Sequence, residues 1–434
     1  MSAECSAENI PSGYKKTEIG VIPEDWDVVT TLDACSKIQD GTHFSPQISG
    51  NDYLYITSKN IRFGYFDIST ASRIDTAQHQ VIYRRCDVKK GDLLLTKDGA
   101  STGNAALNTL DEEFSLLSSV AFLRFHQSKY CAAYFLQQIL TSSGQHQIQD
   151  AMAGNAITRL TLEKVKKLRF PVPPTLAEQE AIAEALSDTD ALIESLEQLI
   201  AKKRQIKQGA MQELLTGKRR LPGFSGEWKV KLLDDLFDFS GGLSASRDQL
   251  SMEGYCYLHY GDIHTSKKNF IDVRSEQQDI PKLNISLKKV ASPSLLNDGD
   301  VVFVDASEDD EGTSRHIVVF NKDKIPFISG LHTIVAKSKK NELDKQYLRY
   351  CFQTDDVKKQ FYFFAVGTKV SGISKTNIVK ITLPVPSLSE QAAIAAILSD
   401  MDSEITALEE KLAKARQIKQ GMMQELLTGR IRLV

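Results

Sequence analysis

Two long stretches of the chain, residues 175–217 and 387–434, repeat apolar residues at spacings that keep them on one face of a helix. In the first stretch these residues are Ile182, Leu186, Ile193, Leu196, Ile200, Ala210 and Leu214. In the second they are Ile394, Leu398, Met401, Ile405, Leu408, Leu412, Ala415, Met422 and Leu426. Such a stripe is typical of a helix packed against a partner helix, so we predict two coiled-coil helices. A helix of about 40 residues is about 60 Å long at 1.5 Å per residue.

The same start and stop signals frame both stretches. Each follows a proline-rich segment, opens with a Ser/Thr-x-x-Glu capping box and closes with a glycine suited to left-handed backbone. The capping pairs are Thr175 with Glu178 and Ser387 with Glu390, and the closing glycines are Gly217 and Gly429. These signals predict that both helices begin and end at equivalent places.

Residues Leu176–Leu221 occur a second time, lightly changed, as Leu388–Leu433. Roughly two thirds of the positions are identical without a gap, which is more than a shared helical composition gives. A whole domain's length of chain lies between the copies, so the repeat is not that of a solenoid. We therefore predict a first globular domain at residues 1–174, a central helix at 175–217, a second globular domain at 218–386 and a C-terminal helix at 387–434.

Charge divides each helix into an acidic first half and a basic second half. In the first copy, residues 178–197 contain no lysine or arginine, and residues 202–220 are basic apart from Glu213. This order complements the dipole of each helix, which is one explanation for it. It also places acid beside base if the two helices run antiparallel. We predict an intrachain antiparallel coiled coil, with a parallel or intermolecular pair as the alternative.

The segments in front of the two helices also match, though more faintly. The chain's two tryptophans, Trp26 and Trp228, occupy the same place in each half. Most elements predicted there are short β-rich runs separated by Gly, Asn and Asp, with short helices at residues 130–140 and 345–352. The expected fold is therefore mixed α/β (α+β), with two similar globular domains, two long helices and a pseudo-two-fold arrangement.

Composition places the chain among ordinary soluble proteins, with 41% hydrophobic and 25% charged residues. No stretch approaches the length of a membrane span and no export signal is visible, so we expect a cytoplasmic protein without a membrane. The six cysteines are scattered, which predicts reduced thiols and no metal site. The net charge of −3 gives no overall sign of nucleic-acid binding, which would need a local basic face.

The sequence lacks the common motifs of catalysis. It has no Walker A sequence, nucleophile elbow or His-Glu-x-x-His motif. It also lacks the Asn/Asp-Pro-Pro-aromatic motif that positions an amino group for methyl transfer. Glu227-Trp228-Lys229 is similar to the end of a nuclease metal site, but no aspartate on a preceding strand accompanies it. We therefore predict a protein with no active site, metal or cofactor of its own.

Several segments resemble the specificity (S) subunits of type I restriction–modification enzymes. Residues Gly13–Gly20 followed by Ile22–Trp26 are similar to the start of that family. The Pro-Val-Pro segment followed by Leu-x-Glu-Gln, present before both helices, is similar to the entry to the family's helical spacers. Gln212–Gly217 and Gln424–Gly429 are similar to the ends of those spacers. The resemblance covers the whole chain except residues 1–12.

This resemblance implies two target-recognition domains, each reading one half of a split, asymmetric DNA sequence and held apart by the two helices. It implies three kinds of partner: double-stranded DNA, two methyltransferase subunits that modify adenine, and motor–nuclease restriction subunits that join through the methyltransferase complex. S-adenosylmethionine, ATP and Mg would be bound by those partners. This chain would itself be non-catalytic.

Base-reading side chains are expected beside two matched glycine turns, at Gly41 and Gly242, and in the strands that follow them. Residues Asp40–His43 are similar to a loop in one version of the family's recognition domain, and the second half departs from it. The candidate DNA-binding residues are Thr42, His43, Ser45, Lys59 and Asn60 in the first domain, and Ser244, Ser246, Arg247, His259 and Asp262 in the second. The alternative is that the glycines only permit a tight structural turn.

Two other functions remain open from the sequence. One is a two-domain coiled-coil scaffold or adaptor that binds peptide or carbohydrate. The other is a fused restriction–methylation polypeptide, which the missing motifs oppose. Bipartite sequence-specific DNA binding, or copurification with a methyltransferase, would separate the DNA-recognition subunit from the scaffold.

Overall fold

The computed structural model describes residues 10–48, 50–152, 159–307, 314–367 and 371–433. The chain divides into two compact units, which we call unit 1 (Met1–Glu197 with Glu410–Val434) and unit 2 (Gln198–Glu409). Each unit consists of one globular domain and one half of each long helix.

An antiparallel sheet of four short strands forms the centre of unit 1. Its strand order is β4 (Cys35–Asp40), β10 (Val120–Phe125), β7 (Leu93–Thr96) and β8 (Ala105–Leu107). Successive side chains point to opposite faces of the sheet, so Leu93 and Leu95 belong to one core cluster and Leu94 to another. Every residue of β7 is buried, because both faces of the sheet are covered.

Smaller sheets and helices complete unit 1. A three-stranded sheet has the order β6 (Ser72–Ile74), β5 (Tyr53–Ile56) and β9 (Phe114–Leu116), with β5 parallel to β9. Two-stranded sheets are formed by β1 (Tyr14–Thr17) with β2 (Gly20–Pro23) and by β3 (Asp27–Thr30) with β11 (Arg169–Val172). The helices are α1 (Thr31–Ala34), α2 (Thr76–Tyr83), α3 (Ala132–Leu140), α4 (Ser142–Met152) and α5 (Leu162–Val165). The helix predicted at residues 130–140 is α3.

Unit 2 repeats the main sheet and the smaller sheet of unit 1, each with one more strand. That sheet has the order β13 (Phe237–Gly241), β22 (Thr333–Ser338), β18 (Val301–Val304), β20 (His316–Phe320) and β16 (Phe270–Asp272). The second sheet has the order β14 (Leu250–Ser251), β17 (Lys282–Leu283), β15 (Tyr255–Leu258) and β21 (Phe327–Ser329). Two-stranded sheets are formed by β12 (Lys229–Leu232) with β24 (Thr382–Val385) and by β19 (Ala306–Ser307) with β23 (Ser371–Gly372).

The helices of unit 2 are α7 (Leu233–Leu236), α8 (Tyr260–Thr265), α9 (Val273–Glu276), α10 (Leu348–Cys351), α11 (Asp355–Phe364) and α12 (Lys375–Ile378). The first four strands of its main sheet correspond in order and direction to β4, β10, β7 and β8 of unit 1. The two halves therefore share one mixed α/β fold, as the faint sequence repeat predicted.

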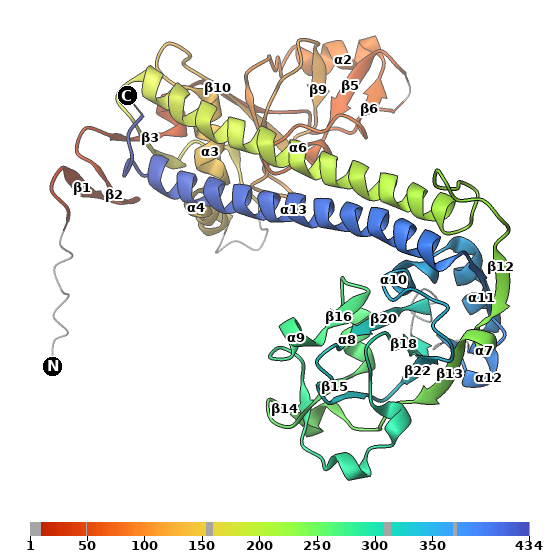
Figure 1. Cartoon of the computed structure of the whole chain (residues 1–434). Coiled ribbons are helices and arrows are strands. Elements are labelled where there is room, and N and C mark those ends of the chain that lie inside the picture. Colours follow the sequence, from red (N-terminus) through yellow and green to blue (C-terminus); the bar gives the residue numbers. More distant parts are fainter. Residues whose placement is uncertain (1–9, 49, 153–158, 308–313, 368–370, 434) are drawn as a thin grey trace. The chain divides into compact units, whose positions relative to one another are not determined.

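Two helices of 39 residues, α6 (Leu176–Leu214) and α13 (Leu388–Leu426), confirm the predicted helical pair (Figure 1). The hydroxyl of Thr175 caps α6 by accepting a hydrogen bond from the N–H of Glu178 at 3.2 Å. Both predicted terminal glycines have left-handed backbone, with φ of +72° at Gly217 and +71° at Gly429. Both helices thus begin one residue after the predicted capping residue, whereas α13 ends at Leu426, before the end of the predicted helical segment at residue 434.

Acid–base pairs join the two helices in antiparallel order. In unit 1, Asp190 Oδ1 lies 2.5 Å from Lys419 Nζ. In unit 2, Lys203 Nζ lies 2.6 Å from Glu404 Oε1. The early residues of one helix therefore meet the late residues of the other, which confirms the intrachain antiparallel coiled coil. Exposed ion pairs stabilise a fold weakly, so their main effect is to favour this direction of pairing.

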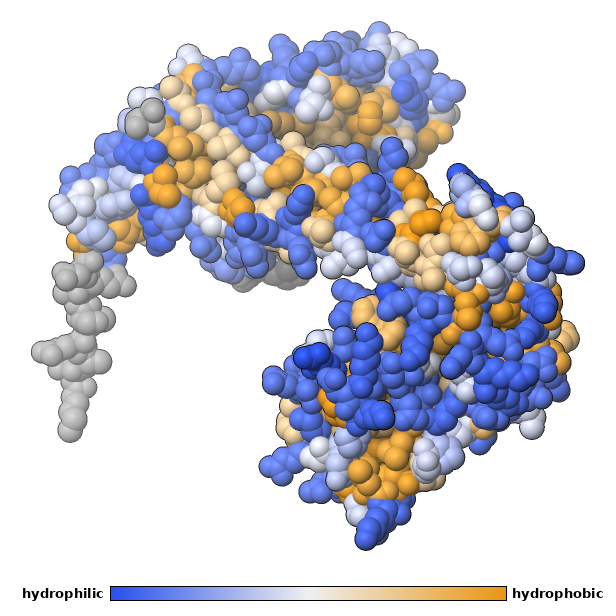
Figure 2. Space-filling model, viewed as in Figure 1, coloured by the Kyte–Doolittle hydropathy of each residue, from blue (hydrophilic) through white to orange (hydrophobic). Residues whose placement is uncertain are grey.

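Hydrophilic residues cover most of the surface of each unit that is visible in Figure 2. Among the helices formed by the described residues, none combines the length and the apolar character that crossing a membrane requires.

Candidate functional site

One edge of the main sheet in unit 1 gathers the loops that carry candidate residues. Strand β4 ends at this edge with Asp40, which pairs with Ala121 near the start of β10. Strand β7 also ends there, because Leu95 pairs with Ala105, the first residue of β8. We call this side of the sheet the loop edge of unit 1.

Unit 2 has an equivalent loop edge. Gly241, the last residue of β13, pairs with Ile334 near the start of β22. Phe303 near the end of β18 pairs with His316, the first residue of β20. The repeat therefore places two sets of loops at matching positions on two copies of one sheet.

The matched glycines at these edges are required by close packing. A Cβ on Gly41 would lie 2.0 Å from the carbonyl oxygen of Leu116, and a Cβ on Gly242 would lie 1.9 Å from that of Gly330. Neither glycine has the positive φ that a left-handed turn would need. Their role is thus to let two backbone segments approach each other, and the residues that follow them are the exposed part of each loop.

Four of the five candidate residues of unit 1 are accessible at the loop edge. Thr42 is half-buried, while Ser45 and Lys59 are exposed. The side chain of His43 is 69% exposed, and its Nε2 lies 3.6 Å from Oδ1 of Asp40. These groups supply a hydroxyl, an imidazole and an ammonium, which suit base edges and phosphates.

Asn60 differs from the other candidates because the fold uses its side chain. It is 2% exposed, accepts a hydrogen bond from the N–H of Thr57 at 3.0 Å and donates one to the carbonyl of Asp67 at 3.0 Å. The neighbouring N–H of Ser58 donates to the hydroxyl of Ser119 at 3.3 Å, which ties this segment to the loop edge. Asn60 thereby shapes the segment that presents Lys59.

A buried lysine lies beneath the first loop and was not among the candidate residues. Lys97 is 2% exposed, and its Nζ lies 3.2 Å from both Asp40 Oδ2 and Asp98 Oδ2. Arg159 Nε lies 2.8 Å from the other oxygen of Asp98. Because a buried charge is costly without a partner, this network fixes Asp40 and, through it, the loop of His43. Its sequence signal is a lone lysine directly after the apolar strand β7.

Three candidate residues of unit 2 come together at the start of α8. Arg247 Nη2 lies 3.3 Å from Asp262 Oδ1, and the N–H of His259 donates to Asp262 Oδ2 at 3.2 Å. The Nδ1 of His259 accepts a hydrogen bond from the N–H of Gly261 at 3.1 Å. Burial, followed by the charge of Arg247, lowers the pKa of His259, which favours the neutral ring that caps this helix.

The other two candidates of unit 2 are exposed serines. The N–H of Ser246 donates to Gln249 Oε1 at 2.9 Å, so this residue caps the short helical turn that carries Arg247. Ser244 precedes it on the same loop. The guanidinium of Arg247 is 63% exposed beside them.

Aromatic and imidazole rings surround this cluster, and the sequence did not single them out. The ring of Tyr260 lies 4.4 Å from that of His259, 5.3 Å from that of His332 and 6.0 Å from that of His264. His332 has a left-handed φ of +57°, uncommon for a residue other than glycine, and its Nδ1 lies 3.2 Å from Asp305 Oδ1. Such local strain is often found at functional sites.

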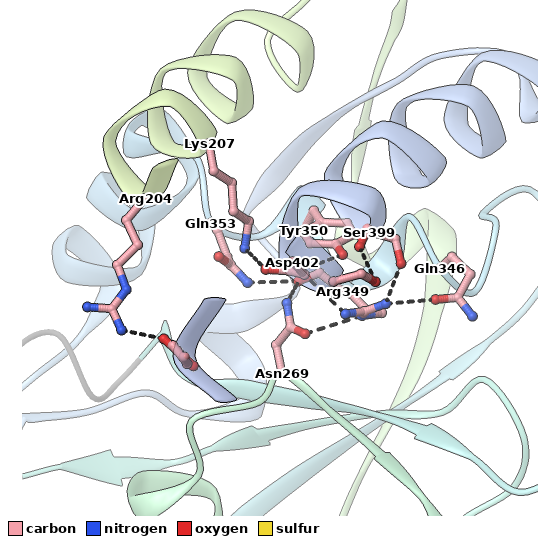
Figure 3. A network of polar contacts seen from close by, with 11 residues as sticks. Arg204, Lys207, Asn269, Gln346, Arg349, Tyr350, Gln353, Ser399 and Asp402 are labelled. Atoms are coloured by element: carbon pink, nitrogen blue, oxygen red, sulfur yellow. Dashed lines mark hydrogen bonds and ion pairs between the residues drawn. The ribbon is translucent and has the colours of Figure 1, made fainter. Parts of the chain in front are cut away.

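A polar network anchors the globular domain of unit 2 to its helix α13 (Figure 3). Asp402 accepts a hydrogen bond from the hydroxyl of Tyr350 at 2.8 Å, lies 3.5 Å from Arg349 Nη2 and pairs with Lys207 of α6. Arg349 is buried and lies 3.3 Å from Asn269 Oδ1. Helices α6 and α10 are thereby held to one residue of α13.

Unit 1 repeats this anchor in a simpler form. Asp190 of α6, the equivalent of Asp402, pairs with Lys419 of α13 and accepts a hydrogen bond from Gln137 of α3 at 3.4 Å. In both units the anchor holds the globular domain to the helices. Among the described residues, no group of three or more His, Cys, Asp or Glu side chains could hold a metal ion.

Comparisons with known proteins agree with this architecture. The family described as "Type I restriction modification DNA specificity domain" matches residues 23–206 and again residues 225–419. The putative type I restriction enzyme MjaX specificity subunit of Methanocaldococcus jannaschii is 26% identical, over 97% of this chain and 97% of that protein. The MjaVIII specificity subunit of the same organism is 25% identical, over 95% and 94%.

Solved structures share the fold. The S subunit of a type I restriction–modification system from M. genitalium superposes with a TM-score of 0.58 at 16% identity, covering 92% of this chain and 96% of that one. A chain from a study of the assembly and conformational transition of a type I restriction–modification system has a TM-score of 0.52 at 16% identity, covering 94% and 99%.

Proposed function

The chain belongs to the type I restriction–modification DNA specificity family, and from this premise we propose that it reads a bipartite, asymmetric DNA sequence for a methylating and restricting complex. The observation that carries the proposal is the pair of loop edges. They lie on copies of one sheet topology but present different side chains. Because the two domains share one geometry but present different side chains, they suit two different half-sequences.

The chemistry of the two loop edges differs at equivalent positions. Thr57 and Asn60 form the cap after β5 in unit 1, while His259 and Asp262 form the cap after β15 in unit 2. In unit 2 Arg247, from another loop, pairs with the cap residue Asp262, and its planar guanidinium can bind guanine O6 and N7 together; in unit 1 Arg62 follows the cap and lies 3.5 Å from Asp67. Unit 1 presents hydroxyl, imidazole and ammonium groups from Thr42, His43 and Lys59. We therefore expect unlike half-sequences.

We propose that partner subunits, and not this chain, carry out the chemistry on the DNA. We propose that methyltransferase subunits, binding S-adenosylmethionine, modify adenine at the sequence this chain selects, in the cytoplasm. Motor–nuclease subunits, binding ATP and Mg, would join through them and cut unmodified DNA. The chain's own contribution is then selection of the sequence and placement of its partners.

Two equivalent surfaces suit two copies of one methyltransferase subunit. The segments Arg204–Gly209 and Arg416–Gly421 are identical in sequence. Their isoleucines, Ile206 and Ile418, are exposed to the same extent, at 48% and 49%. Because the same apolar side chain is exposed to the same extent in both repeats, the two surfaces suit two copies of one partner subunit. We propose docking surfaces that include Glu178–Gly217 and Glu390–Gly429.

Coexpression tests this function. The chain is expressed with the methyltransferase subunit that copurifies with it, and the methylated adenines of the host DNA are mapped by sequencing. We expect methylation at one split sequence with two unlike halves. A two-domain scaffold for peptide or carbohydrate would give no such methylation and no sequence-specific DNA binding.

A further inference from the structure

Two aromatic side chains stand exposed at the tip of a tight turn in unit 1. Ile61 and Phe66 form an antiparallel bridge, and the N–H of Arg62 donates to the carbonyl of Tyr65 at 3.0 Å. Between these residues the side chains of Phe63 and Tyr65 are 54% and 60% exposed. Exposing two rings loses the free energy that burial would give, so the turn is not explained by packing within the domain.

The base of this turn is rigidly held. Buried Asn60 donates to the carbonyl of Asp67, whose N–H donates back to the carbonyl of Asn60 at 2.8 Å. Asn104 donates to the carbonyl of Ile61 at 3.1 Å, and the ring of Phe66 packs 5.6 Å from that of Phe114. The two exposed rings are thus presented by an ordered turn, which lowers the entropy cost of binding a ligand there.

The turn lies on the loop edge of unit 1. The N–H of Gly64 donates to the carbonyl of Ala105, the first residue of β8, at 3.0 Å. Strand β8 begins where β4 and β7 end, so the turn shares this edge with Thr42 and the buried Lys97. It also follows directly on the segment that presents Lys59.

Unit 2 fills the equivalent corner with polar groups. The guanidinium of Arg315 donates to the carbonyl of His264, much as Asn104 donates to the carbonyl of Ile61 in unit 1. Exposed Lys267 follows nearby in the chain. Both units therefore place groups suited to nucleic acid at this corner, Lys267 in unit 2 and two aromatic rings beside the exposed Arg62 in unit 1.

We propose that Phe63 and Tyr65 contact thymine methyl groups in the half-sequence that unit 1 reads. This inference rests on the proposed DNA-recognition function and adds two contact residues to it. The rings carry no charge, so their contribution comes from apolar contact. Their neighbours Lys59 and Thr42 offer phosphate and base-edge contacts at the same edge.

The test uses the complete methyltransferase complex and a duplex that carries its mapped sequence. Binding is measured by fluorescence anisotropy over a range of salt concentrations for Phe63→Ser, Tyr65→Ser and the double variant. We expect each single change to weaken binding about fivefold or more, because each removes the burial of about half of an aromatic side chain. The slope of log affinity against log salt should stay that of the wild type, because no phosphate contact is lost. Lys59→Ala should instead lower that slope by about 1.

Two sets of controls keep the result interpretable. Phe63→Tyr and Tyr65→Phe retain the apolar surface of the ring and should bind within about threefold of the wild type. Leu32→Ser changes a side chain that is 56% exposed on α1, at the start of β4 and thus at the opposite edge, and should have no effect.

Wild-type affinity in the double serine variant, or loss of the methyltransferase subunits from that variant, would overturn the inference. In either case the wild type would still bind its sequence, so the proposed function would stand. If the wild type itself showed no sequence-specific binding, both the proposed function and this inference would be refuted.

Discussion

In unit 1 the guanidinium of Arg432 donates two hydrogen bonds to the carboxylate of Glu178, with Nη2 lying 2.8 Å from Oε2. Glu178 is 2% exposed, and the guanidinium lies 5.7 Å from the centre of the Trp26 ring. Unit 2 has the same arrangement, in which Arg220 binds Glu390 at 2.8 Å. The glutamate predicted as a capping residue thus joins the start of one helix to the chain after the other helix.

Removing this arginine should destabilise unit 1. Arg432→Ala leaves the buried carboxylate of Glu178 without its partner, and we expect a loss of about 2 kcal/mol in the free energy of unfolding. That is below the roughly 3–5 kcal/mol found for fully buried pairs, because Arg432 is partly exposed. Urea unfolding of the full chain measures it. Arg430→Ala, two residues away and 63% exposed, is the matched control and should change little.

Unit 2 should lose stability in mild acid because of His316. Burial lowers the pKa of this histidine to about 4, against about 6.5 in an unfolded chain. The unfolded state therefore binds a proton first, and stability is complete above pH 6.5 and falls as the pH drops toward 4. We expect about 2 kcal/mol less stability at pH 5 than at pH 7. In His316→Leu, urea unfolding should show this part of the pH dependence removed; an unchanged profile would contradict the assignment.

The reader loops can be separated by substitution. Arg247→Ala should cost about 1–3 kcal/mol of binding and relax the choice of one base in the half-sequence read by unit 2, because a bidentate contact is specific. Lys59→Ala should weaken binding to all sequences alike, as expected for a phosphate contact. Methylation maps of the variants and the wild type decide between these effects. If Arg247→Ala and His43→Ala both kept full activity and an unaltered sequence, these loops would not be the readers.

The sequence predicted the helices better than the sites. Helices α6 and α13 were predicted from the spacing of their apolar residues, their capping residues and their terminal glycines, all of which are local signals. The antiparallel direction was predicted from the order of charges along each helix. The acidic half of one helix lies beside the basic half of the other only if the helices are antiparallel. Helices α4 and α11 were not predicted, since short amphipathic segments resemble the β-rich runs around them.

The candidate sites depend on contacts between distant parts of the chain. Tyr260 meets His332 only because β15 and β21 pair in parallel, which no local pattern reveals. Lys97 is buried because Asp40 is brought beside it by a different strand. Asn60 was nominated by its residue type, but its environment gives it a structural role. Residue type and spacing thus nominated residues on these loops, while the fold decides what each side chain can reach.

The docking surfaces make a prediction about stoichiometry. Ile206→Asp and Ile418→Asp each place a charge on one of two equivalent apolar positions, and each should remove one methyltransferase subunit from the complex. The double variant should remove both. Mass measurement of the purified complexes shows the number of copies. A one-to-one complex formed by the wild type at saturation would refute the idea of two equivalent surfaces.

Helix length should set the distance between the two half-sequences. Helices of 39 residues are about 58 Å long, which corresponds to at most about 17 base pairs at 3.4 Å per step. Inserting four residues between Leu196 and Ala201, and four more between Leu408 and Ala413, adds about 6 Å to each helix and keeps the antiparallel seam matched. We expect the unread spacer to grow by about one or two base pairs while both half-sequences stay the same. An insertion in one helix alone should break the matched acid–base pairs and reduce stability. Methylation mapping of the double insertion is the measurement, and an unchanged spacer would show that helix length does not determine it.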